Sequence, residues 1–566
     1  MKHCPECNRN YADPTISFCL NDGAPLIFGE AVEESPTAIL TDEGRNESPT
    51  RILDPHTTAP TESFPFPVAD AKQSRAGGWK LPVLVSLALL LLGAAGVIAY
   101  LYLEKPSNKA IQSIAVLPFQ NGSGSQDLEF LSDGLSAMLI DKLSQLPQLK
   151  VISRTSSFKF RDPNPDIQDI AAKLGVQAVV TGQVAKQGET LTVRVEMIDA
   201  KDNTQIWGEQ FARKANDAVE IQQEIAQTVL QKLKIKLSSA QEQSLARVGT
   251  TNPDAYELFL QGKVFHDRGG LENRKKANQY FEQAIAKDPN YALPYAYLSR
   301  SYLIMAGNGV GDPKEFDPKA EAAAQQALRL DPTQAEAHLA MASVYLHQWK
   351  WDNARGAIER AIEFSPNSER AYQSLAFYHS IHGRHVEAVA EARRALELDP
   401  VSLGSLDRVA LTLCYARQFD ESIETAKKVI ELDPKHGYAY TVLGYSYAGA
   451  GRFREAINTH IESAKIDAPL PSDKIFLGAA YANAGERAKA IEILNELRST
   501  REYVSPGELP VLLVALGDKE AAFASLEGAY EAHDLQLLYL KADPAFDPLR
   551  DDPRFADLLR RIGLPQ

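Results

Sequence analysis

Cysteine is scarce in this sequence, and most of it lies at one end. Only four of the 566 residues are cysteine, and Cys4, Cys7 and Cys19 fall in the first 19 positions. Cys414 is alone in the long remainder, so no disulfide framework can support that part of the chain. The cysteine count therefore assigns no compartment to the larger part of the protein.

An excess of basic residues is lacking as well. The chain has 60 Lys and Arg against 74 Asp and Glu, which gives a formal net charge of -14 and a pI of about 5.4. Binding to nucleic acid depends on basic side chains that neutralise phosphates. We therefore expect no nucleic-acid partner.

Catalytic motifs are also absent. The sequence contains no His-Glu-x-x-His, no Gly-x-Ser-x-Gly and no protein-kinase motif set. The Gly-Ser-Gly stretch at residues 122–124 lacks a third glycine and a phosphate-binding lysine, so a turn is preferred to a nucleotide site. His379, His382 and His385 are better explained as repeat packing and turn residues than as metal ligands, and Cys414 as an inert thiol. We predict that the chain is not an enzyme.

What the sequence does have is a period of 34 residues. Pro332, Pro366, Pro400 and Pro434 follow one another at this spacing. Small residues recur twelve positions before these prolines, at Ala320, Ala354, Ala388 and Ser422. A period of about 34 residues is typical of helix-turn-helix repeat arrays, which bind partners rather than catalyse reactions.

These positions resemble the tetratricopeptide repeat (TPR), in which small residues let two helices cross closely. Gly383, Gly451 and Gly485 fall at the predicted turn between the helices of a unit, where a positive φ suits glycine. We therefore place an all-helical TPR superhelix with a C-terminal cap at residues 252–566.

The TPR resemblance also implies where a partner binds. TPR arrays usually hold extended peptides on the concave face, which the first helices of the units form. Carrying those repeat positions onto this chain gives a peptide-binding groove of Arg370, Gln373, Phe377, Asp407, Tyr438, Thr441 and Tyr445. The alternative is that some of these side chains only pack neighbouring units together.

Residues 80–104 contain one long apolar run. Leu81 to Leu103 carries no charge, and as a helix it would span about 34 Å, enough for a hydrocarbon core of about 30 Å. Tyr100 and Tyr102 lie near one end of the run and Trp79 near the other, as interface anchors do. We predict a single-pass helix in the bacterial inner (cytoplasmic) membrane. The flanking basic residues and the N-terminal cysteines favour a cytoplasmic N-terminus, with the C-terminal domains periplasmic or extracellular.

Residues 1–27 resemble a small zinc ribbon. Cys4 and Cys7 form a Cys-x2-Cys pair, but the second half has Asp22 where another cysteine is expected after Cys19. We predict a structural zinc ion held by Cys4, Cys7, Cys19 and Asp22. His3 is an alternative fourth ligand, and a degenerate ribbon without metal is the other alternative. About 25 residues cannot fold on an apolar core alone, so the metal would supply the stability.

Residues 28–79 are rich in Pro, Thr, Ser, Glu and Asp, and we predict a disordered linker. A short stretch recurs in it, with a leucine three residues after Thr37 and again after Thr50. This pattern resembles phosphothreonine ligands of forkhead-associated domains, so both threonines are candidate phosphosites for a phosphothreonine reader at the cytosolic tail. A duplicated stretch of solvated linker is the simpler alternative.

Residues 110–245 alternate between strand and helix patterns. Apolar runs predict strands at 114–119, 149–153, 176–184, 190–198 and 205–211, and helical spacing predicts helices at 130–143, 167–174 and 219–233. The segments FLSDGLSAMLIDKL and VRVEMIDAKDNTQIWGEQF, among others, resemble the TolB amino-terminal-like family, which is related to the FlgO domain. In that family the domain often precedes TPR repeats and is not known as a catalyst.

The predicted fold class is therefore multidomain, with a small zinc ribbon, one transmembrane helix, a mixed α/β domain and an all-α TPR superhelix. The favoured function is a membrane-anchored scaffold that binds protein or peptide partners through its TPR and TolB-like domains. The alternative is a transmembrane signalling or regulatory protein that couples an external sensor region to the cytosolic ribbon and tail. An undetected enzyme in the α/β domain is the least favoured hypothesis.

Overall fold

The protein, seen here as a computed structural model, divides into two units, Met1–Glu104 and Lys105–Gln566. The structure describes residues 2–3, 10–11, 27–28, 111–124, 126–214, 218–233, 235–247, 249–268, 270–307, 313–466, 471–501 and 503–565. The predicted zinc ligands, the linker and the apolar run at 80–104 lie outside these residues. Among the residues that are described, no helix combines the length and the apolar character needed to cross a membrane.

The first unit contributes three short strands. They are β1 (Lys2–His3), β2 (Asn10–Tyr11) and β3 (Ile27–Phe28), which pair antiparallel in the order β2-β1-β3. These strands flank the predicted cysteine ligands in the sequence, and the zinc ribbon itself stays a prediction.

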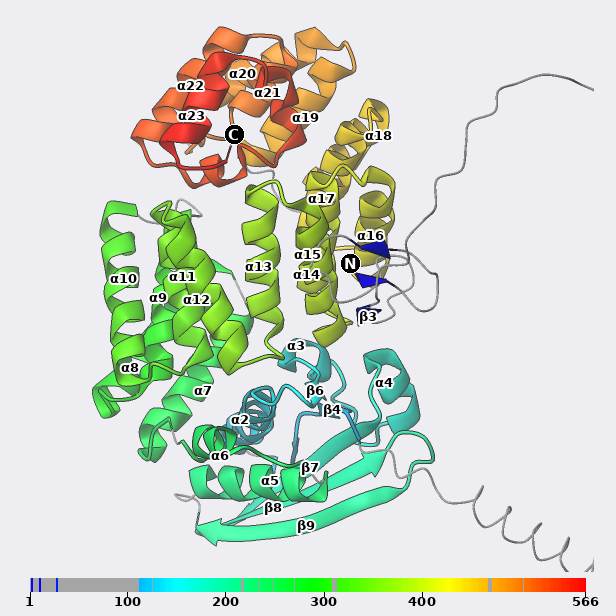
Figure 1. Cartoon of the computed structure of the whole chain (residues 1–566), viewed down its shortest axis with the longest axis vertical. Helices are drawn as coiled ribbons and strands as arrows, with labels where there is room; N and C mark the ends of the chain where they lie inside the picture. The colour runs from blue at the N-terminus through cyan, green and yellow to red at the C-terminus, as the bar shows by residue number, and fades with distance from the viewer. Residues whose placement is uncertain are drawn as a thin grey trace, which may run out of the picture. The chain divides into compact units, whose positions relative to one another are not determined.

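The second unit begins with the predicted mixed α/β domain (Figure 1). Its strands are β4 (Ser113–Val116), β5 (Gln120–Asn121), β6 (Lys150–Val151), β7 (Ala178–Gln187), β8 (Thr190–Asp199) and β9 (Gln205–Lys214). Its helices are α2 (Gln126–Leu143), α3 (Arg154–Ser157), α4 (Ile167–Leu174), α5 (Ala218–Lys232) and α6 (Ser239–Ala246). The sheet order is β6-β4-β7-β8-β9, with β5 beside β7. Strands β6, β4 and β7 run parallel, and β8 and β9 continue the sheet antiparallel.

Helices cover both faces of this sheet. Ile114 and Val116 of β4 join the apolar cluster formed with α2 and α5, whereas Ala115 joins the cluster formed with α4. Successive side chains of a strand point to opposite faces. A strand buried on both faces must therefore be apolar throughout, which is why this one reads as an uninterrupted apolar run.

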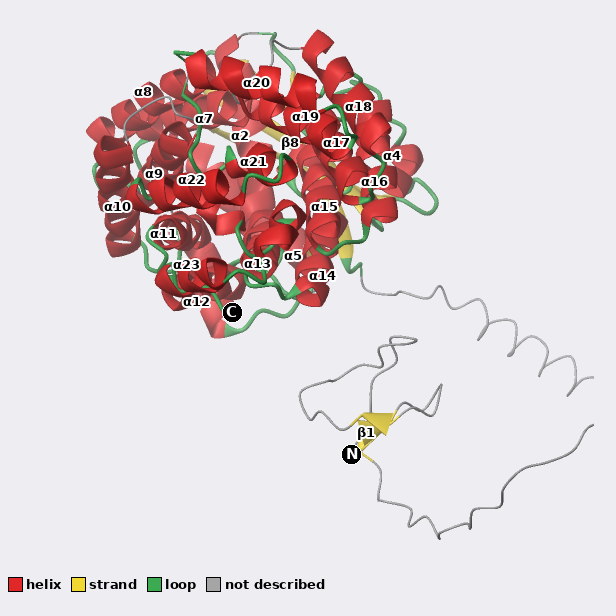
Figure 2. Cartoon of the chain, turned by 90° about the horizontal axis from the view of Figure 1, so that it is seen from above, coloured by secondary structure: helices red, strands yellow, loops and turns green. Residues whose placement is uncertain are grey.

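The rest of the second unit is helical, as Figure 2 shows, and the predicted TPR superhelix is confirmed. The helix pairs are α7 (Pro253–Arg268) and α8 (Leu271–Lys287), α9 (Ala292–Gly307) and α10 (Pro313–Leu330), α11 (Ala335–His347) and α12 (Trp351–Phe364), α13 (Glu369–Ile381) and α14 (His385–Leu398), α15 (Leu403–Tyr415) and α16 (Phe419–Leu432), α17 (Gly437–Gly449) and α18 (Phe453–Ile466), and α19 (Pro471–Asn483) and α20 (Arg487–Ser499). The chain ends with α21 (Pro510–Ala515), α22 (Lys519–Glu531), the 3-10 helices η2 (Leu535–Tyr539) and η3 (Pro544–Leu549), and α23 (Pro553–Arg561).

The turn inside a helix pair takes a left-handed backbone conformation. Gly383, Gly451 and Gly485 have φ values of 72°, 73° and 83°, as their repeat position predicts. The same repeat position holds Trp349, with φ 54°, and Arg417, with φ 59°. A side chain in this region of φ costs about 1 kcal/mol or more, so contacts made by these two side chains must offset that cost.

Those contacts are with the C-terminal segment, which we define as residues 533–565. The Trp349 ring stacks on His533 with centroids 3.8 Å apart. Arg417 Nη1 donates to the carbonyl oxygen of Ala542 at 2.7 Å. Trp351 Nε1 donates to the carbonyl oxygen of Ile562 at 2.8 Å. The C-terminal segment therefore folds back onto helices of the middle repeats.

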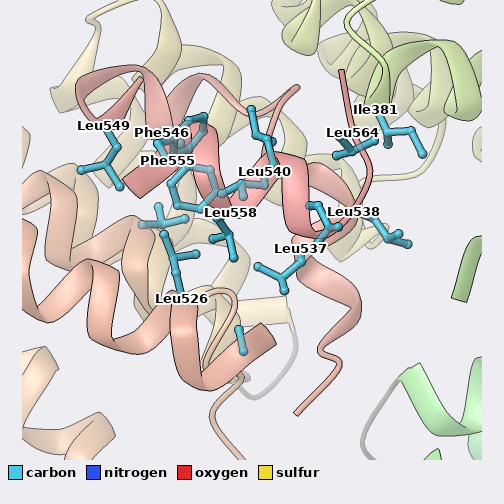
Figure 3. Close-up of a cluster of buried hydrophobic side chains, with 14 of the residues drawn as sticks. Ile381, Leu526, Leu537, Leu538, Leu540, Phe546, Leu549, Phe555, Leu558 and Leu564 are labelled. Carbon is cyan, nitrogen blue, oxygen red and sulfur yellow. The ribbon is translucent and has the colours of Figure 1, made fainter. Parts of the chain in front are cut away.

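Apolar packing fixes the C-terminal segment in this position. Figure 3 shows its leucines and phenylalanines gathered with Leu526 of α22 and Ile381 of α13 in one cluster. Leu537 and Leu558 are 1% exposed, and Leu540 and Leu549 are 0% exposed. The leucine-rich stretch at residues 535–540, which lies beyond the helix pairs, thus contributes to the core between the end of the array and its middle.

Two buried side chains at the turns between repeats hold the α/β domain against the array. Asn367 Nδ2 donates to the carbonyl oxygens of Leu146 at 2.9 Å and Leu149 at 2.8 Å. The carboxylate of Asp399 accepts hydrogen bonds from the hydroxyls of Ser153 and Ser156. The two domains that the sequence suggests as separate therefore form one unit.

We expect Asn367→Ala to lower the free energy of unfolding by about 1–3 kcal/mol, because the buried carbonyl oxygens of the loop before β6 lose their donor. Urea unfolding of the full chain measures the change. Asn458→Ala, on the exposed face of α18, is the matched control and should change stability by less than about 0.5 kcal/mol. Equal effects of the two substitutions would show that the amide of Asn367 does not hold the domains together.

Candidate functional site

The seven predicted groove residues lie on first helices of consecutive repeats. Arg370, Gln373 and Phe377 are on α13, Asp407 is on α15, and Tyr438, Thr441 and Tyr445 are on α17. They have three different surroundings, which are the α/β domain at one end, the C-terminal segment at the other, and an accessible strip between them.

At the end near the α/β domain, the predicted groove residues are engaged in polar contacts. Arg370 forms an ion pair with Glu336, and Gln373 Nε2 donates to Ser405 Oγ at 3.0 Å. The Asp407 carboxylate contacts His436 Nε2 at 2.6 Å. Burial raises the pKa of Asp407, and the hydrogen bond with His436 opposes that rise. These side chains at least help to pack neighbouring units together.

At the other end, the predicted groove residues contact the C-terminal segment. Phe377 meets Tyr539 edge-on, with ring centroids 5.4 Å apart. The Tyr445 hydroxyl donates to the Asp543 carboxylate. Burial raises the pKa of Asp543 to about 6, and the hydrogen bond with Tyr445 opposes that rise. The chain's own C-terminal segment thus occupies the positions where a peptide was predicted to contact Tyr445.

Between these ends lies a partly accessible strip, which we call the central strip and define as Phe377, Arg408, Tyr438 and Thr441. Phe377 forms its boundary with the C-terminal segment. Tyr438 is 50% exposed, and the Arg408 guanidinium lies 5.9 Å from the centre of the Phe377 ring. Burial nevertheless raises the pKa of Tyr438 to about 12. The Tyr438 side chain is half exposed to solvent, yet its neighbours desolvate its hydroxyl group. Side chains that lie inside a groove combine these two properties.

Sequence reasoning missed a cavity of about 1370 Å³ between the α/β domain and the first helices of the repeats. Its wall combines residues of α2 and α3 with residues of α7, α8, α9, α11, α13 and α15. Charged side chains that line it include Asp141, Arg154, Lys263, Asp267, Arg274, Arg300, Glu336, Glu369 and Arg370. The one local signal was the polar set Lys263, His266 and Asp267, at helical spacing on an inward-facing helix.

Part of this charge is paired inside the cavity. Arg154 of α3 forms an ion pair with Asp267 of α7, which joins the two domains. Lys263 Nζ donates to the Tyr297 hydroxyl at 2.9 Å, and Arg370 Nη2 reaches the same hydroxyl at 3.4 Å. Tyr297 therefore lies between two cations at the centre of the wall.

Two carboxyl groups of the wall have raised pKa values. Burial raises the pKa of Glu369 to about 7, with Arg370 opposing the rise. Burial also raises the pKa of Asp141, with Lys263 opposing it. At neutral pH the wall therefore carries less negative charge than its carboxyl groups alone suggest.

Among the residues described, no three His, Cys, Asp or Glu side chains are placed to hold a metal ion. His382 Nδ1 contacts the carbonyl oxygen of Tyr378 at 2.8 Å, and burial lowers the pKa of His379 to about 4. Burial raises the pKa of Cys414 to about 12, which agrees with an inert thiol. The predicted zinc ligands Cys4, Cys7, Cys19 and Asp22 and the phosphosites Thr37 and Thr50 lie outside the described residues.

Family comparisons match two parts of the chain. Residues 109–228 match the second domain of HilA/YgeH-like transcriptional regulators. Residues 318–369 and 410–471 match the tetratricopeptide repeat. The resemblance of the α/β domain to the TolB amino-terminal-like family is not shown by these matches and stays a prediction.

One curated relative is a protein of Rhizobium meliloti (strain 1021) assigned as adenylate cyclase 3. It is 30% identical over 255 residues, which is 44% of this chain and 43% of the relative. The match therefore spans less than half of the relative's own length.

Solved structures of repeat proteins are also similar. A tetratricopeptide repeat protein from Parabacteroides merdae is 16% identical, covers 47% of this chain and 99% of its own, and has a TM-score of 0.34. The type IV pilus biogenesis factor PilW is 19% identical, covers 38% of this chain and 98% of its own, and has a TM-score of 0.32. At such TM-scores these likenesses carry no argument about function, and the identification of the repeats rests on the family match and the fold.

Acidic side chains crowd where the C-terminal segment meets the last repeats, and this makes stability depend on pH. Burial, then Asp534 and Asp473, raises the pKa of Glu508 to about 7. A carboxyl whose folded pKa is raised stabilises the protein below its unfolded pKa, and this contribution is lost as pH rises through about 7. At pH 8 the Glu508→Gln variant should therefore be more stable than the wild type and unfold at a higher urea concentration. The expected gain in the free energy of unfolding is about 1 kcal/mol after allowing for screening.

The free energies of unfolding of the wild type and of Glu508→Gln should differ little at pH 5, where Glu508 is protonated in the folded protein. Urea unfolding at both pH values measures the difference. Glu492→Gln, on the exposed surface of α20, is the control and should behave like the wild type at both. A gain that is equal at pH 5 and pH 8 would contradict the raised pKa.

Proposed function

We propose that the protein is a membrane-anchored interaction scaffold that binds protein or peptide partners through its joined α/β and TPR domains. The proposal is supported by the repeat family match and by one observation above all. Tyr438 of the central strip is 50% exposed on the inner face, between the end that meets the α/β domain and the end that the C-terminal segment covers.

The composition of the central strip suits a peptide. Its two aromatic rings offer apolar area, and its guanidinium offers a charged hydrogen-bond donor. Since the pKa of Tyr438 is raised to about 12, its phenol stays protonated at neutral pH and can donate to a peptide carbonyl. The bound segment would be short, because both ends of the groove are closed by the chain itself.

Residues 1–104 complete the proposal. A helix at 80–104 would anchor the chain in the bacterial inner membrane, with a cytoplasmic N-terminus and periplasmic or extracellular C-terminal domains. A zinc ion on Cys4, Cys7, Cys19 and Asp22 would hold the N-terminal ribbon together. Phosphorylation of Thr37 and Thr50 would recruit a phosphothreonine reader to the cytosolic tail.

A regulatory role is the second candidate, because the comparisons favour it. Residues 109–228 match a domain of transcriptional regulators, and the Rhizobium meliloti relative is assigned as a cyclase. In this chain a ribbon and a flexible tail would take the output position, and we propose no catalytic activity for it.

A photo-crosslinking amino acid at position 438, in the full chain in its native membrane, should capture a distinct partner protein. The same amino acid at Val386 is the control, because that residue is 82% exposed but lies on the second helix of its repeat. Arg408→Ala should reduce capture from position 438 by about 10-fold, the effect of losing one charge-assisted hydrogen bond. Equal capture of the partner protein from positions 438 and 386 would contradict the proposal that the central strip binds it.

Deleting residues 80–104 should move the protein from the membrane pellet to the supernatant of a cell lysate, because the apolar run would be gone. Western blotting of the two fractions measures this. Deleting residues 53–77 of the linker removes the same length of chain and should leave the protein in the pellet. Continued pelleting after the first deletion, in carbonate as well as in buffer, would contradict the anchor.

A further inference from the structure

Two arginines of the cavity wall lack a polar partner among the described residues. Arg274 of α8 and Arg300 of α9 both line the cavity, and neither forms an ion pair or a hydrogen bond with any residue that the structure describes. Two further arginines of the wall differ in this respect, since Arg154 is paired with Asp267 and Arg370 with Glu336. A guanidinium has five N–H donors and stays charged at neutral pH.

Several buried guanidinium N–H donors of the wall have no partner among the described residues, and neither has a ring nitrogen of His266, which donates or accepts according to its tautomer. Arg274 Nη1, Arg154 Nε, Arg370 Nε and His266 Nδ1 are buried and have no hydrogen-bond partner among the described residues. His266 is 5% exposed, and its ring lies 5.2 Å from that of Tyr297. Buried polar atoms of a folded protein are nearly always satisfied, so several unsatisfied donors around one hollow point to a missing acceptor.

The positive charges also repel one another. Burial, and then Arg370, lowers the pKa of Arg300, while Glu336 and Asp267 oppose that fall in part. Burial alone lowers the pKa of Arg274. Burial, then Arg300, lowers the pKa of His266 well below its usual value, so this ring is neutral at pH 7. Bringing cations together away from bulk water is unfavourable unless an anion lies between them.

We propose that this cavity binds a small organic anion that carries phosphate or carboxylate groups, and that Arg274 and Arg300 are its main ligands. Both groups present two oxygens in the geometry that a guanidinium matches with two parallel hydrogen bonds. Arg370 and Lys263 line the adjoining wall and add positive charge. With a volume of about 1370 Å³, the cavity has room for a molecule of the usual metabolite size.

The site goes beyond the proposed scaffold function, because its main ligands, Arg274 and Arg300, are not part of the central strip. Its wall comes from both domains, since Arg154 belongs to the α/β domain and Arg300 to the repeats. An anion bound here would bridge the two, and it would stabilise the folded unit by mass action.

The test is isothermal titration calorimetry on the full chain, purified in a mild detergent, with inorganic pyrophosphate in one arm and citrate in the other. We expect saturable binding of one molecule per chain in at least one arm, and the tighter arm identifies phosphate or carboxylate as the preferred group. Arg300→Gln and Arg274→Gln should each weaken that binding at least about 10-fold. Arg355→Gln, an exposed arginine on α12, should leave it unchanged.

A second measurement separates a ligand role from a structural one. Thermal melting without any anion should find Arg300→Gln at least as stable as the wild type, because the substitution removes a repelling charge. Arg300→Lys keeps the charge but not the paired donors, so it should bind with intermediate affinity. Absence of saturable binding in both arms, or wild-type affinity in both glutamine variants, would overturn the proposal. So would a fall in melting temperature of Arg300→Gln without anion.

Discussion

The hydrogen bonds of Asn367 and Asp399 fix the position of the α/β domain against the repeats, and the other features of the second unit depend on that position. They hold the loops on either side of β6 at the turns between successive repeats. Because both side chains are buried, separating the α/β domain from the repeats would leave several polar groups unsatisfied at once. The α/β domain is therefore fixed across the first helices of the array, and the charged cavity exists only because of that placement.

The other end of the inner face is closed by a different kind of contact. The C-terminal segment packs its leucines against α13 and the last repeats, which is a non-directional gain from apolar burial. Its position is then specified by directional contacts from Trp349 and Arg417, which occupy a turn position where the other repeats have glycine. The strain of a left-handed backbone at these two residues is offset by the contacts that their side chains make.

Features that depend on local sequence could be predicted, because they follow from spacing along the chain. The helix pairs follow from the 34-residue period, the positive φ of Gly383 follows from its turn position, and the mixed sheet follows from apolar runs. The packing of the C-terminal segment and the cavity could not be predicted in this way. Both depend on contacts between residues far apart in the chain, such as Arg154 and Asp267, which are 113 positions apart, and no periodicity links those residues.

The predicted groove illustrates the same limit at single residues. Its helices and their inward face follow from the repeat position, and all seven residues do lie on first helices. The surroundings of each residue cannot be predicted from its repeat position, because the neighbouring side chains come from other parts of the chain. Asp543 lies 98 residues beyond Tyr445, and only the fold of the whole unit brings that carboxylate to the phenol.

The cavity and the central strip share two helices, and this links their occupancy. Helix α13 carries Arg370 in the cavity wall and Phe377 in the strip, while Arg408 of α15 belongs to both surfaces. An anion that drew the Arg408 guanidinium toward the cavity would remove it from a peptide on the strip, and a peptide that held it would remove it from the anion. Such an effect on affinity is necessarily reciprocal. Binding of a small molecule at the joint between domains and binding of a partner along the repeats would then oppose each other through a single side chain.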